Sequence, residues 1–255
     1  MANVGRCLLP VAALVAGLAC NRAPMNVQDG FETLPDKSLW RSRKFAPGAV
    51  EAQSAVVRSG RQAAKITLRH GDWSERNDTP GGPVLERAEL EESPDLWSAE
   101  DQAYEQAFSV WLPADFPVAP VRLVIAQWKQ KCPHDGCTPG NPLVAVRYSG
   151  GELRVTAGPE RKTLYRTSEE IRNRWLDFRF RLRFSAGEKG RLQMSLNDRP
   201  VADYTGPLTY PASGGYPAGG NRFYFKIGLY RDETPQPMTI VIDDYYKREL
   251  SGEPF

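Results

Sequence analysis

Regular alternation of apolar and polar residues is the feature of this sequence that most constrains its fold. In WLDFRFRLRFS, residues 175–185, five Leu and Phe residues alternate with Asp and three Arg. Successive side chains of an extended chain point to opposite faces, so this stretch is predicted to be a strand with one buried face and one solvated basic face. The same period recurs along most of the chain: residues 63–69, 84–92, 107–113, 122–129, 143–148, 152–157, 191–197, 222–230 and 238–246.

The spacing of these stretches predicts an all-β protein. Many short strands with little helix between them favour two antiparallel sheets packed face to face. Turn sequences such as SGG and NDRP separate several strands, and one short helix is expected in TSEEIRNRW, residues 167–175. Three segments lack the alternation and are expected to be loops: residues 21–62, 70–83 and 205–221. A sandwich of about this size often forms one domain, which we assign to residues 20–255.

The N-terminal residues have the character of an export signal. Arg6 precedes the apolar stretch CLLPVAALVAGLA, which is too short to span a bilayer but long enough for a signal-peptide core. We therefore assign residues 1–19 to a signal peptide and expect an exported protein, periplasmic or secreted. Cys20 directly follows the apolar stretch, as at a lipoprotein cleavage site, although Gly17 replaces the usual Leu; a lipid anchor at Cys20 stays open.

Two cysteines in CPHDGC indicate a disulfide. Pro133 and Gly136 favour a tight loop that would bring Cys132 and Cys137 together, and an exported protein meets an oxidising environment. A zinc site using both thiolates and His134 is the alternative, but structural zinc takes four ligands and no second Cys or His pair follows. We expect a disulfide and no metal.

The overall charge excludes one large class of partners. The chain has 33 basic and 31 acidic residues. Such a balance lacks the electrostatic footprint of a nucleic-acid binder, so attraction for an acidic ligand must be local. No nucleotide or phosphate motif is present, so we expect no organic cofactor. We also expect a monomer.

Three of the predicted strands have unusual polar faces. In YFKIGLYR, residues 224–231, two Tyr, one Lys and a Gly share the face opposite Phe, Ile and Leu. The stretch VLERAELEE places Arg87, Glu89 and Glu91 on one face, and RLVIAQWKQ does the same with Gln127 and Lys129. A sandwich could align these large hydrogen-bonding groups across one sheet, although each strand alone is also explained as a solvated face.

In this order, the stretches ERAEL, IAQWK and YFKIGLYR resemble the motifs of jelly-roll polysaccharide lyases, above all the heparin-lyase-I-like and glucuronan lyases, with alginate lyases more distant. The similarity covers roughly residues 60–246. The resemblance implies a concanavalin-like jelly roll that binds an acidic, uronate-containing polysaccharide and cleaves it by β-elimination, leaving an unsaturated uronate end.

The residue types fit that chemistry. Elimination removes a proton next to a carboxylate, so groups that bind the carboxylate and stabilise the developing charge are needed. Gln127 and Arg87 suit this role, and Tyr230 could protonate the leaving oxygen.

Four of the expected substrate-binding residues lie in the same stretches, and the fifth, Arg76, lies in RHGDWSERND. We expect Gly228 to leave room for the sugar chain, and Glu89 to orient Arg87. The expected substrate-binding residues are Lys226, Tyr224, Glu89, Arg231 and Arg76.

The catalytic base is harder to assign. The related lyases usually have histidine at the position of Lys129, and a lysine is a base near neutrality only if its surroundings lower a pKa of about 10.4 by several units. Three hypotheses stay open: Tyr230 is both base and acid while Lys129 binds anions, His70 in RHGDWSERND is the base, or the activity is lost.

Two other functions deserve comparison. A jelly-roll glycoside hydrolase could use Glu89 and Glu91 as its paired carboxylates, but ERAELEES does not match the usual Glu-x-Asp-x-x-Glu pattern. A non-catalytic acidic-glycan-binding protein could use tryptophans as stacking platforms, although most tryptophans in a sandwich belong to the core.

Overall fold

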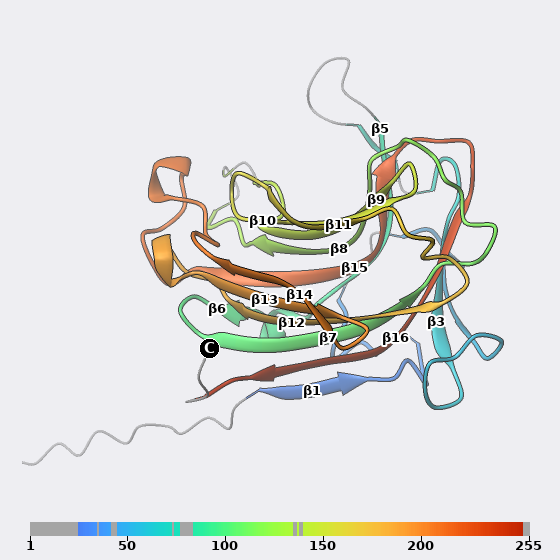
Figure 1. The fold of residues 1–255 in the computed structure, drawn as a ribbon, viewed down its shortest axis with the longest axis horizontal. Helices are drawn as coiled ribbons and strands as arrows, with labels where there is room; N and C mark the ends of the chain where they lie inside the picture. The colour runs from blue at the N-terminus through green and yellow to red at the C-terminus, as the bar shows by residue number, and fades with distance from the viewer. Residues whose placement is uncertain are drawn as a thin grey trace, which may run out of the picture.

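A computed structural model describes residues 25–34, 36–41, 45–72, 74–76, 84–134, 137 and 140–251, and it folds into two stacked sheets (Figure 1). Among the described residues each sheet has eight strands, and every pairing is antiparallel. The first sheet has the order β14-β13-β12-β7-β16-β3-β2, with β1 also paired to β16. The second has the order β11-β10-β9-β8-β15-β5-β4, with β6 also paired to β15. The predicted all-β sandwich is confirmed.

The strands of the two sheets have the following bounds. The first sheet contains β1 (Asn26–Asp29), β2 (Val50–Gln53), β3 (Ala63–Leu68), β7 (Ala103–Trp111), β12 (Trp175–Arg183), β13 (Arg191–Leu196), β14 (Arg199–Thr205) and β16 (Met238–Glu249). The second contains β4 (Ser74–Arg76), β5 (Val84–Glu91), β6 (Ser98–Ala99), β8 (Leu123–Gln130), β9 (Val144–Ser149), β10 (Glu152–Ala157), β11 (Lys162–Thr167) and β15 (Arg222–Asp232). Three single-turn 3₁₀ helices lie between strands: η1 (Pro94–Leu96), η2 (Gly187–Lys189) and η3 (Ala212–Gly214).

The predicted helix at residues 167–175 is wrong. This segment forms the end of β11 and a turn. The Glu170 carboxylate accepts hydrogen bonds from the backbone N–H and the guanidinium of Arg172, and Asn173 adopts a left-handed φ of 57°. These local bonds and the reversed backbone replace the hydrogen bonds of a helix.

All predicted strands are present, but several others lack the sequence signal. β1 and β2 lie within residues 21–62, which were expected to be a loop, and β11 and β14 are edge strands that are exposed along much of their length. A strand that buries few side chains shows no alternation.

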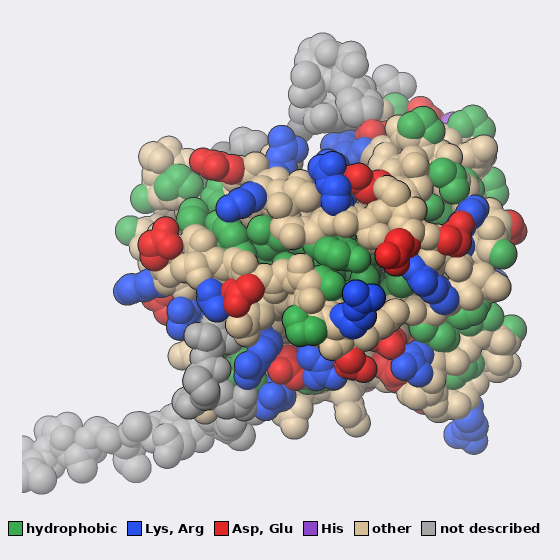
Figure 2. Space-filling model, viewed as in Figure 1, with side chains coloured by type: hydrophobic (Ala, Val, Ile, Leu, Met, Phe, Trp, Pro, Cys, Tyr) green, Lys and Arg blue, Asp and Glu red, His purple; other side chains and the backbone are tan. Residues whose placement is uncertain are grey.

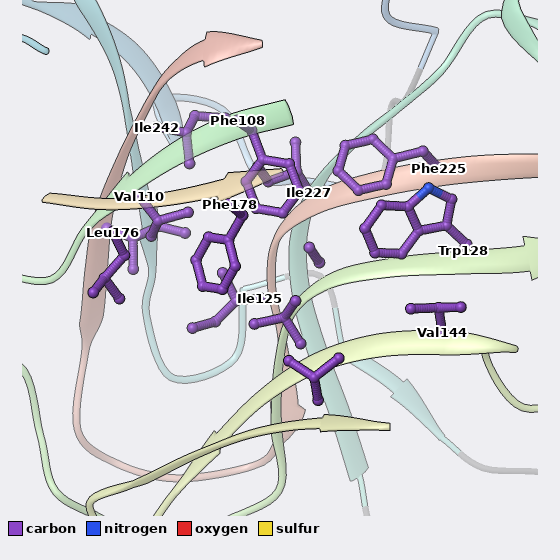
Figure 3. Packing of buried hydrophobic residues seen from close by; sticks show 14 of the residues in the cluster. Phe108, Val110, Ile125, Trp128, Val144, Leu176, Phe178, Phe225, Ile227 and Ile242 are labelled. Atoms are coloured by element: carbon purple, nitrogen blue, oxygen red, sulfur yellow. The ribbon is translucent and has the colours of Figure 1, made fainter. Parts of the chain in front are cut away.

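Apolar side chains from the inner faces of both sheets form the core (Figure 3). Phe108 and Phe178 from one sheet meet Trp128 and Phe225 from the other, with ring centroids 5.2–6.3 Å from Phe108. The alternation in β12 therefore buries the Phe face as predicted. Its Arg face is solvated, and Arg179 and Arg181 form ion pairs with Glu105. Figure 2 shows acidic and basic side chains interspersed over the surface.

A charged pair lies between the sheets. Glu92 and Lys247 are fully buried, with Lys247 Nζ 3.0 Å and 3.1 Å from the two Glu92 carboxylate oxygens. Tyr245 and Gln106 donate to the same carboxylate, and Trp128 donates to Gln106 at 2.8 Å. Burial lowers the pKa of Lys247, and the Glu92 carboxylate opposes this effect. This network joins Lys247 of β16 in the first sheet to Trp128 of β8 in the second.

Within the described residues, no helix is both long and apolar enough to cross a membrane. Residues 1–24, including the predicted signal peptide and Cys20, lie outside the described part of the chain.

Candidate active site

The three polar rows predicted from the sequence lie on adjacent strands. β15 is flanked by β5 on one side and β8 on the other. Tyr230 is directly opposite Arg87 of β5, and Lys226 is opposite Gln127 of β8. Further along, Tyr224 is opposite Lys129. Since Phe225, Ile227 and Leu229 are buried in the core, these polar side chains share the outer face of the second sheet.

A bulge in β15 sets the position of Tyr230. Ile227 pairs with Ala126 and Tyr230 pairs with Val124, so Gly228 and Leu229 together face the single residue between Ala126 and Val124. Gly228 has a φ of 142°, and a Cβ there would lie 2.2 Å from the carbonyl oxygen of Ala88. The glycine is therefore required by the close approach of β5, and not by the sugar chain as the sequence had led us to expect.

Glu89 organises the centre of the site from a buried position. Its carboxylate accepts a hydrogen bond from Gln127 Nε2 and lies 3.8 Å from Arg87 Nη1 and 3.9 Å from Lys226 Nζ. Glu89 thus fixes the amide of Gln127 more directly than it orients Arg87. With one N–H of Gln127 bound to Glu89, the other N–H is left to donate to a ligand.

Glu91 forms the next layer of the network. Lys226 Nζ lies 3.1 Å from its carboxylate, and Arg41 Nε donates to it at 2.7 Å. Burial alone would raise the pKa of Glu91, but Lys226 and Arg41 together outweigh burial, so the pKa is lowered. Glu91 is therefore held as a carboxylate, the wrong state for a general acid.

Tyr230 is surrounded by cations. The guanidinium carbons of Arg87 and Arg122 lie 4.8 Å and 5.7 Å from the centre of its ring. The phenol is half-buried, and the backbone pairing to Arg87 fixes its place on the strand. A negative charge that develops near this phenol would be stabilised by both guanidinium groups.

Lys129 is a cation in an unfavourable environment. Burial together with the nearby charges of Lys226 and Arg87 lowers the pKa of its ammonium to about 8, and Glu89 opposes them. Such a lysine is partly neutral close to physiological pH, so it can accept a proton. The sequence left this possibility undecided, because it depends on burial.

Tyr224 has a different environment from Tyr230. Its ring packs against Trp97 with centroids 5.6 Å apart, and burial raises the pKa of its phenol well above the ordinary value, with Glu91 and Glu89 adding to the effect. Tyr224 therefore remains a neutral phenol.

A cavity of about 280 Å³ lies on this face of the sheet. Its lining contains Arg87, Gln127, Lys129, Lys226 and Tyr230, all predicted from the sequence. It also contains three arginines that the sequence analysis missed: Arg122, Arg147 and Arg161. Among the described residues that line the cavity, none is acidic.

The missed arginines had a weak signal in the sequence. Arg147 occupies a polar position of the alternating stretch at 143–148, and it is paired with Arg154, at a polar position of the stretch at 152–157. A single arginine on a strand is usually a solvated residue, so only the neighbouring strands reveal that several of them meet.

Arg231 lies away from the cavity, and Arg76 is described in its backbone only. Arg231 faces inward and is fully buried, and its Nε donates to the fully buried Glu86 at 2.8 Å. The assignment of Arg231 to substrate binding is therefore wrong, since the residue after Tyr230 must point to the opposite face. Arg76 ends β4, and its side chain lies outside the described structure.

His70 is not among the described residues that line the cavity. Its Nδ1 lies 3.4 Å from Glu86 and 3.8 Å from Glu233. Glu86 points to the opposite side of β5 from Arg87, so the described contacts of His70 lie on that side of the strand, and His70 as the base stays a hypothesis.

His70, Glu86 and Glu233 have ligand atoms within 4.8 Å of one another. One Glu86 oxygen already accepts from Gly71 N and the other from Arg231. These hydrogen bonds compete with a metal ion for the shared carboxylate.

Cys132 and Cys137 form a disulfide, as predicted, with Cα atoms 5.7 Å apart. The bond uses both thiols, so the alternative zinc site is wrong. The disulfide closes the loop that follows β8, and it therefore supports the strand that carries Gln127 and Lys129.

Comparison with known proteins adds information that the geometry lacks. A family model described as "Polysaccharide lyase" matches residues 30–245. No curated protein matches the chain.

Several solved structures are similar to this chain. An endo-β-1,4-glucuronan lyase from the fungus Trichoderma reesei superposes with a TM-score of 0.62 at 17% identity, covering 83% of this chain and 91% of that one. A GH131 β-glucanase catalytic domain from Podospora anserina gives 0.57 at 15% identity, covering 85% and 86%. A family 7 alginate lyase with its GGG product gives 0.53 at 13% identity, covering 82% and 84%. At such low identities these similarities show the jelly-roll fold alone, which lyases and a glucanase share.

Proposed function

The chain belongs to the polysaccharide lyase family and is therefore a carbon–oxygen lyase that acts on polysaccharides, and we propose that its substrate is a uronate-containing polysaccharide cleaved by β-elimination. One observation carries the proposal. The cavity on the outer face of the second sheet brings Gln127 together with several cations and a tyrosine, and none of its described lining residues is acidic. A cavity of this composition suits an anionic sugar.

Gln127 and Arg87 bind the uronate carboxylate in this mechanism. Removal of the C5 proton places further negative charge next to the carboxylate, so the donors must hold the carboxylate as that charge develops. Arg87 offers a fork-shaped cation and Gln127 offers an N–H oriented by Glu89. Lys226 holds the carboxylates of Glu89 and Glu91 in place and keeps Glu91 ionised.

Lys129 is the base and Tyr230 is the acid. The neutral amine of Lys129 takes the C5 proton, the electron pair forms the C4–C5 double bond, and the C4–oxygen bond breaks. The Tyr230 phenol protonates the departing oxygen, and the two side chains then return to their starting states by exchange with water. This assignment is supported by the lowered pKa of Lys129 and by the presence of both side chains in the lining of the same cavity.

The environment of the carboxylates argues against hydrolysis. A retaining hydrolase needs one carboxylate to attack the sugar and a protonated partner to assist the leaving group. Here Glu89 is bound to Gln127 and Glu91 is bound to Lys226 and Arg41, and neither lines the cavity.

The test is a screen of the purified protein against glucuronan, alginate, heparin-type chains and bacterial capsules. A C4–C5 double bond absorbs in the ultraviolet, so we expect absorbance to rise together with the number of chain ends. New reducing ends without absorbance would indicate hydrolysis, and binding without chain shortening would indicate a glycan-binding protein.

Export remains part of the proposal. It is supported by the apolar stretch before Cys20, and N-terminal sequencing of protein recovered from cells and medium tests it. A mature chain that retains residues 1–19 would contradict it.

A further inference from the structure

A row of arginines runs away from the candidate active site, across the strands of the second sheet. Tyr230 of β15 is opposite Val124 of β8, Val124 is opposite Arg147 of β9, and Arg147 is opposite Arg154 of β10. These strands lie side by side in the upper part of Figure 1. On the other side of Tyr230, Arg87 of β5 continues the same row.

The arginines are placed against their own electrostatic preference. Like charges directly opposite each other on neighbouring strands are destabilising, and Arg147 and Arg154 form such a pair. Burial together with the nearby charges of Arg154, Arg161 and Arg122 lowers the pKa of Arg147 to about 10. A bound anion would offset the repulsion between these guanidinium groups.

These residues also lack anionic partners in the structure. In the described part of the chain, Arg147, Arg154 and Arg161 form no ion pair, and the Nε atom of Arg154 is buried without a hydrogen-bond partner. They line a second cavity, of about 490 Å³, in which Glu160 is the single acidic residue among those described. Arg122, Arg147 and Arg161 line both cavities, so the two are adjacent.

We propose that Arg147, Arg154 and Arg161 bind an acidic group on a sugar that flanks the cleaved bond, and that the substrate therefore carries acidic groups on neighbouring sugars. The inference rests on the proposed function and narrows its substrate class. Neighbouring strands are about 4.8 Å apart, which is close to the length of one sugar residue, so a chain lying across the strands would pass from Tyr230 over Arg147 to Arg154. Because guanidinium groups bind carboxylates and sulfates in the same forked geometry, either group satisfies the cluster.

The first experiment compares three kinds of polymer. One is a polyuronate, in which every sugar carries a carboxylate; the second alternates uronate with a neutral sugar; and the third is the second with sulfate on the neutral sugar. We expect kcat/KM of the unmodified protein to be at least about ten-fold higher on the polyuronate than on the alternating neutral polymer. If kcat/KM on the sulfated polymer is as high as on the polyuronate, the arginine cluster accepts sulfate as well as carboxylate. If kcat/KM stays as low as on the neutral polymer, the cluster binds carboxylates.

Single variants then locate the effect. Arg154→Gln should raise KM for the polyuronate about ten-fold with little change in kcat, and should leave cleavage of the alternating neutral polymer unchanged. Arg147→Gln should raise KM for the polyuronate at least as much. The control is Arg179→Gln, which removes an exposed arginine that is paired with Glu105 on the other sheet. This variant should leave KM for both polymers unchanged. Since Arg154→Gln removes a like-charge contact, its Tm should stay equal or rise. An unchanged KM for the polyuronate in both cluster variants overturns the inference, as does a preference for the alternating neutral polymer.

A binding measurement separates this inference from the proposed reaction. Calorimetric titration of uronate oligomers is done with Tyr230→Phe and with the double variant Tyr230→Phe/Arg154→Gln, neither of which depends on turnover. An approximately ten-fold weaker Kd in the double variant supports the cluster even if no polymer gives an unsaturated product, which would overturn only the proposed function. Equal Kd values overturn the cluster even if the protein is an active lyase.

Discussion

The base assignment predicts that Lys129→Arg loses turnover although it keeps the positive charge. Arginine stays protonated at all accessible pH values, so it can bind an anion at this position but cannot take the C5 proton. If Lys129 is the base, kcat should fall by about two to four powers of ten while KM changes little.

The lowered pKa of Lys129 determines how much of its side chain is neutral and able to accept a proton. With a pKa of about 8 instead of the ordinary 10.5, roughly one tenth of the side chain is neutral at pH 7 instead of about 0.03%. Burial together with Lys226 and Arg87 therefore increases the neutral fraction by about 300-fold. A lysine at an exposed position would supply too little neutral amine for this role.

The same pKa predicts that kcat/KM increases with pH. Below pH 8 the ammonium form dominates, so kcat/KM should rise about ten-fold per pH unit towards pH 8 and level off above it. Initial rates of ultraviolet absorbance, measured between pH 5 and pH 9 on the best polymer from the screen, give this profile. In Lys129→Arg the rising limb should disappear, and an added alkylamine should partly restore the rate of Lys129→Ala.

The control is Lys65→Arg, an exposed residue paired with Glu51 on the other sheet, which should match the unmodified protein. A Lys129→Arg protein with near-normal kcat and an unchanged pH profile would refute the reasoning. Lys129 would then be an anion-binding group, and Tyr230 would have to serve as both base and acid.

Three further predictions follow from individual side chains. Tyr230→Phe should lower kcat by about two to four powers of ten and still bind polymer, whereas Tyr224→Phe should cost much less; equal losses would deny Tyr230 a chemical role. Lys247→Met leaves a buried carboxylate without its cation and should destabilise the fold by about 3–5 kcal/mol in denaturant titrations, and a change as small as that of exposed Lys65→Met would contradict this. Gly228→Ala should cost about 3 kcal/mol or more and displace β5, because the added Cβ meets backbone at 2.2 Å; a normal Tm would show that the bulge relaxes freely.

The sequence was sufficient for those elements whose signal is local. Alternation in stretches such as residues 175–185 reports directly which side chains are buried, and it identified the core strands and the outward-facing row of Gln127, Lys129, Lys226 and Tyr230. It could not identify β1, β2, β11 and β14, since strands that bury few side chains carry no such pattern. The turn at residues 167–175 looked like a helix because its capping residues also suit one.

Tertiary structure decided how these residues act. Cross-strand register placed Tyr230 opposite Arg87 and brought Arg147 into line with Arg154, and no property of either strand alone predicts this. Likewise, Arg231 lies one residue from Tyr230 yet is buried against Glu86, because adjacent side chains of a strand face opposite sides of the sheet.

The chemistry of Lys129 shows the same division most clearly. The sequence placed a lysine beside Gln127 but could not say whether it is a cation or a base, because its pKa depends on burial and on charges from other strands. Residue type and alternation are properties of the chain, whereas desolvation and the distance between charges exist only once the sheets have assembled.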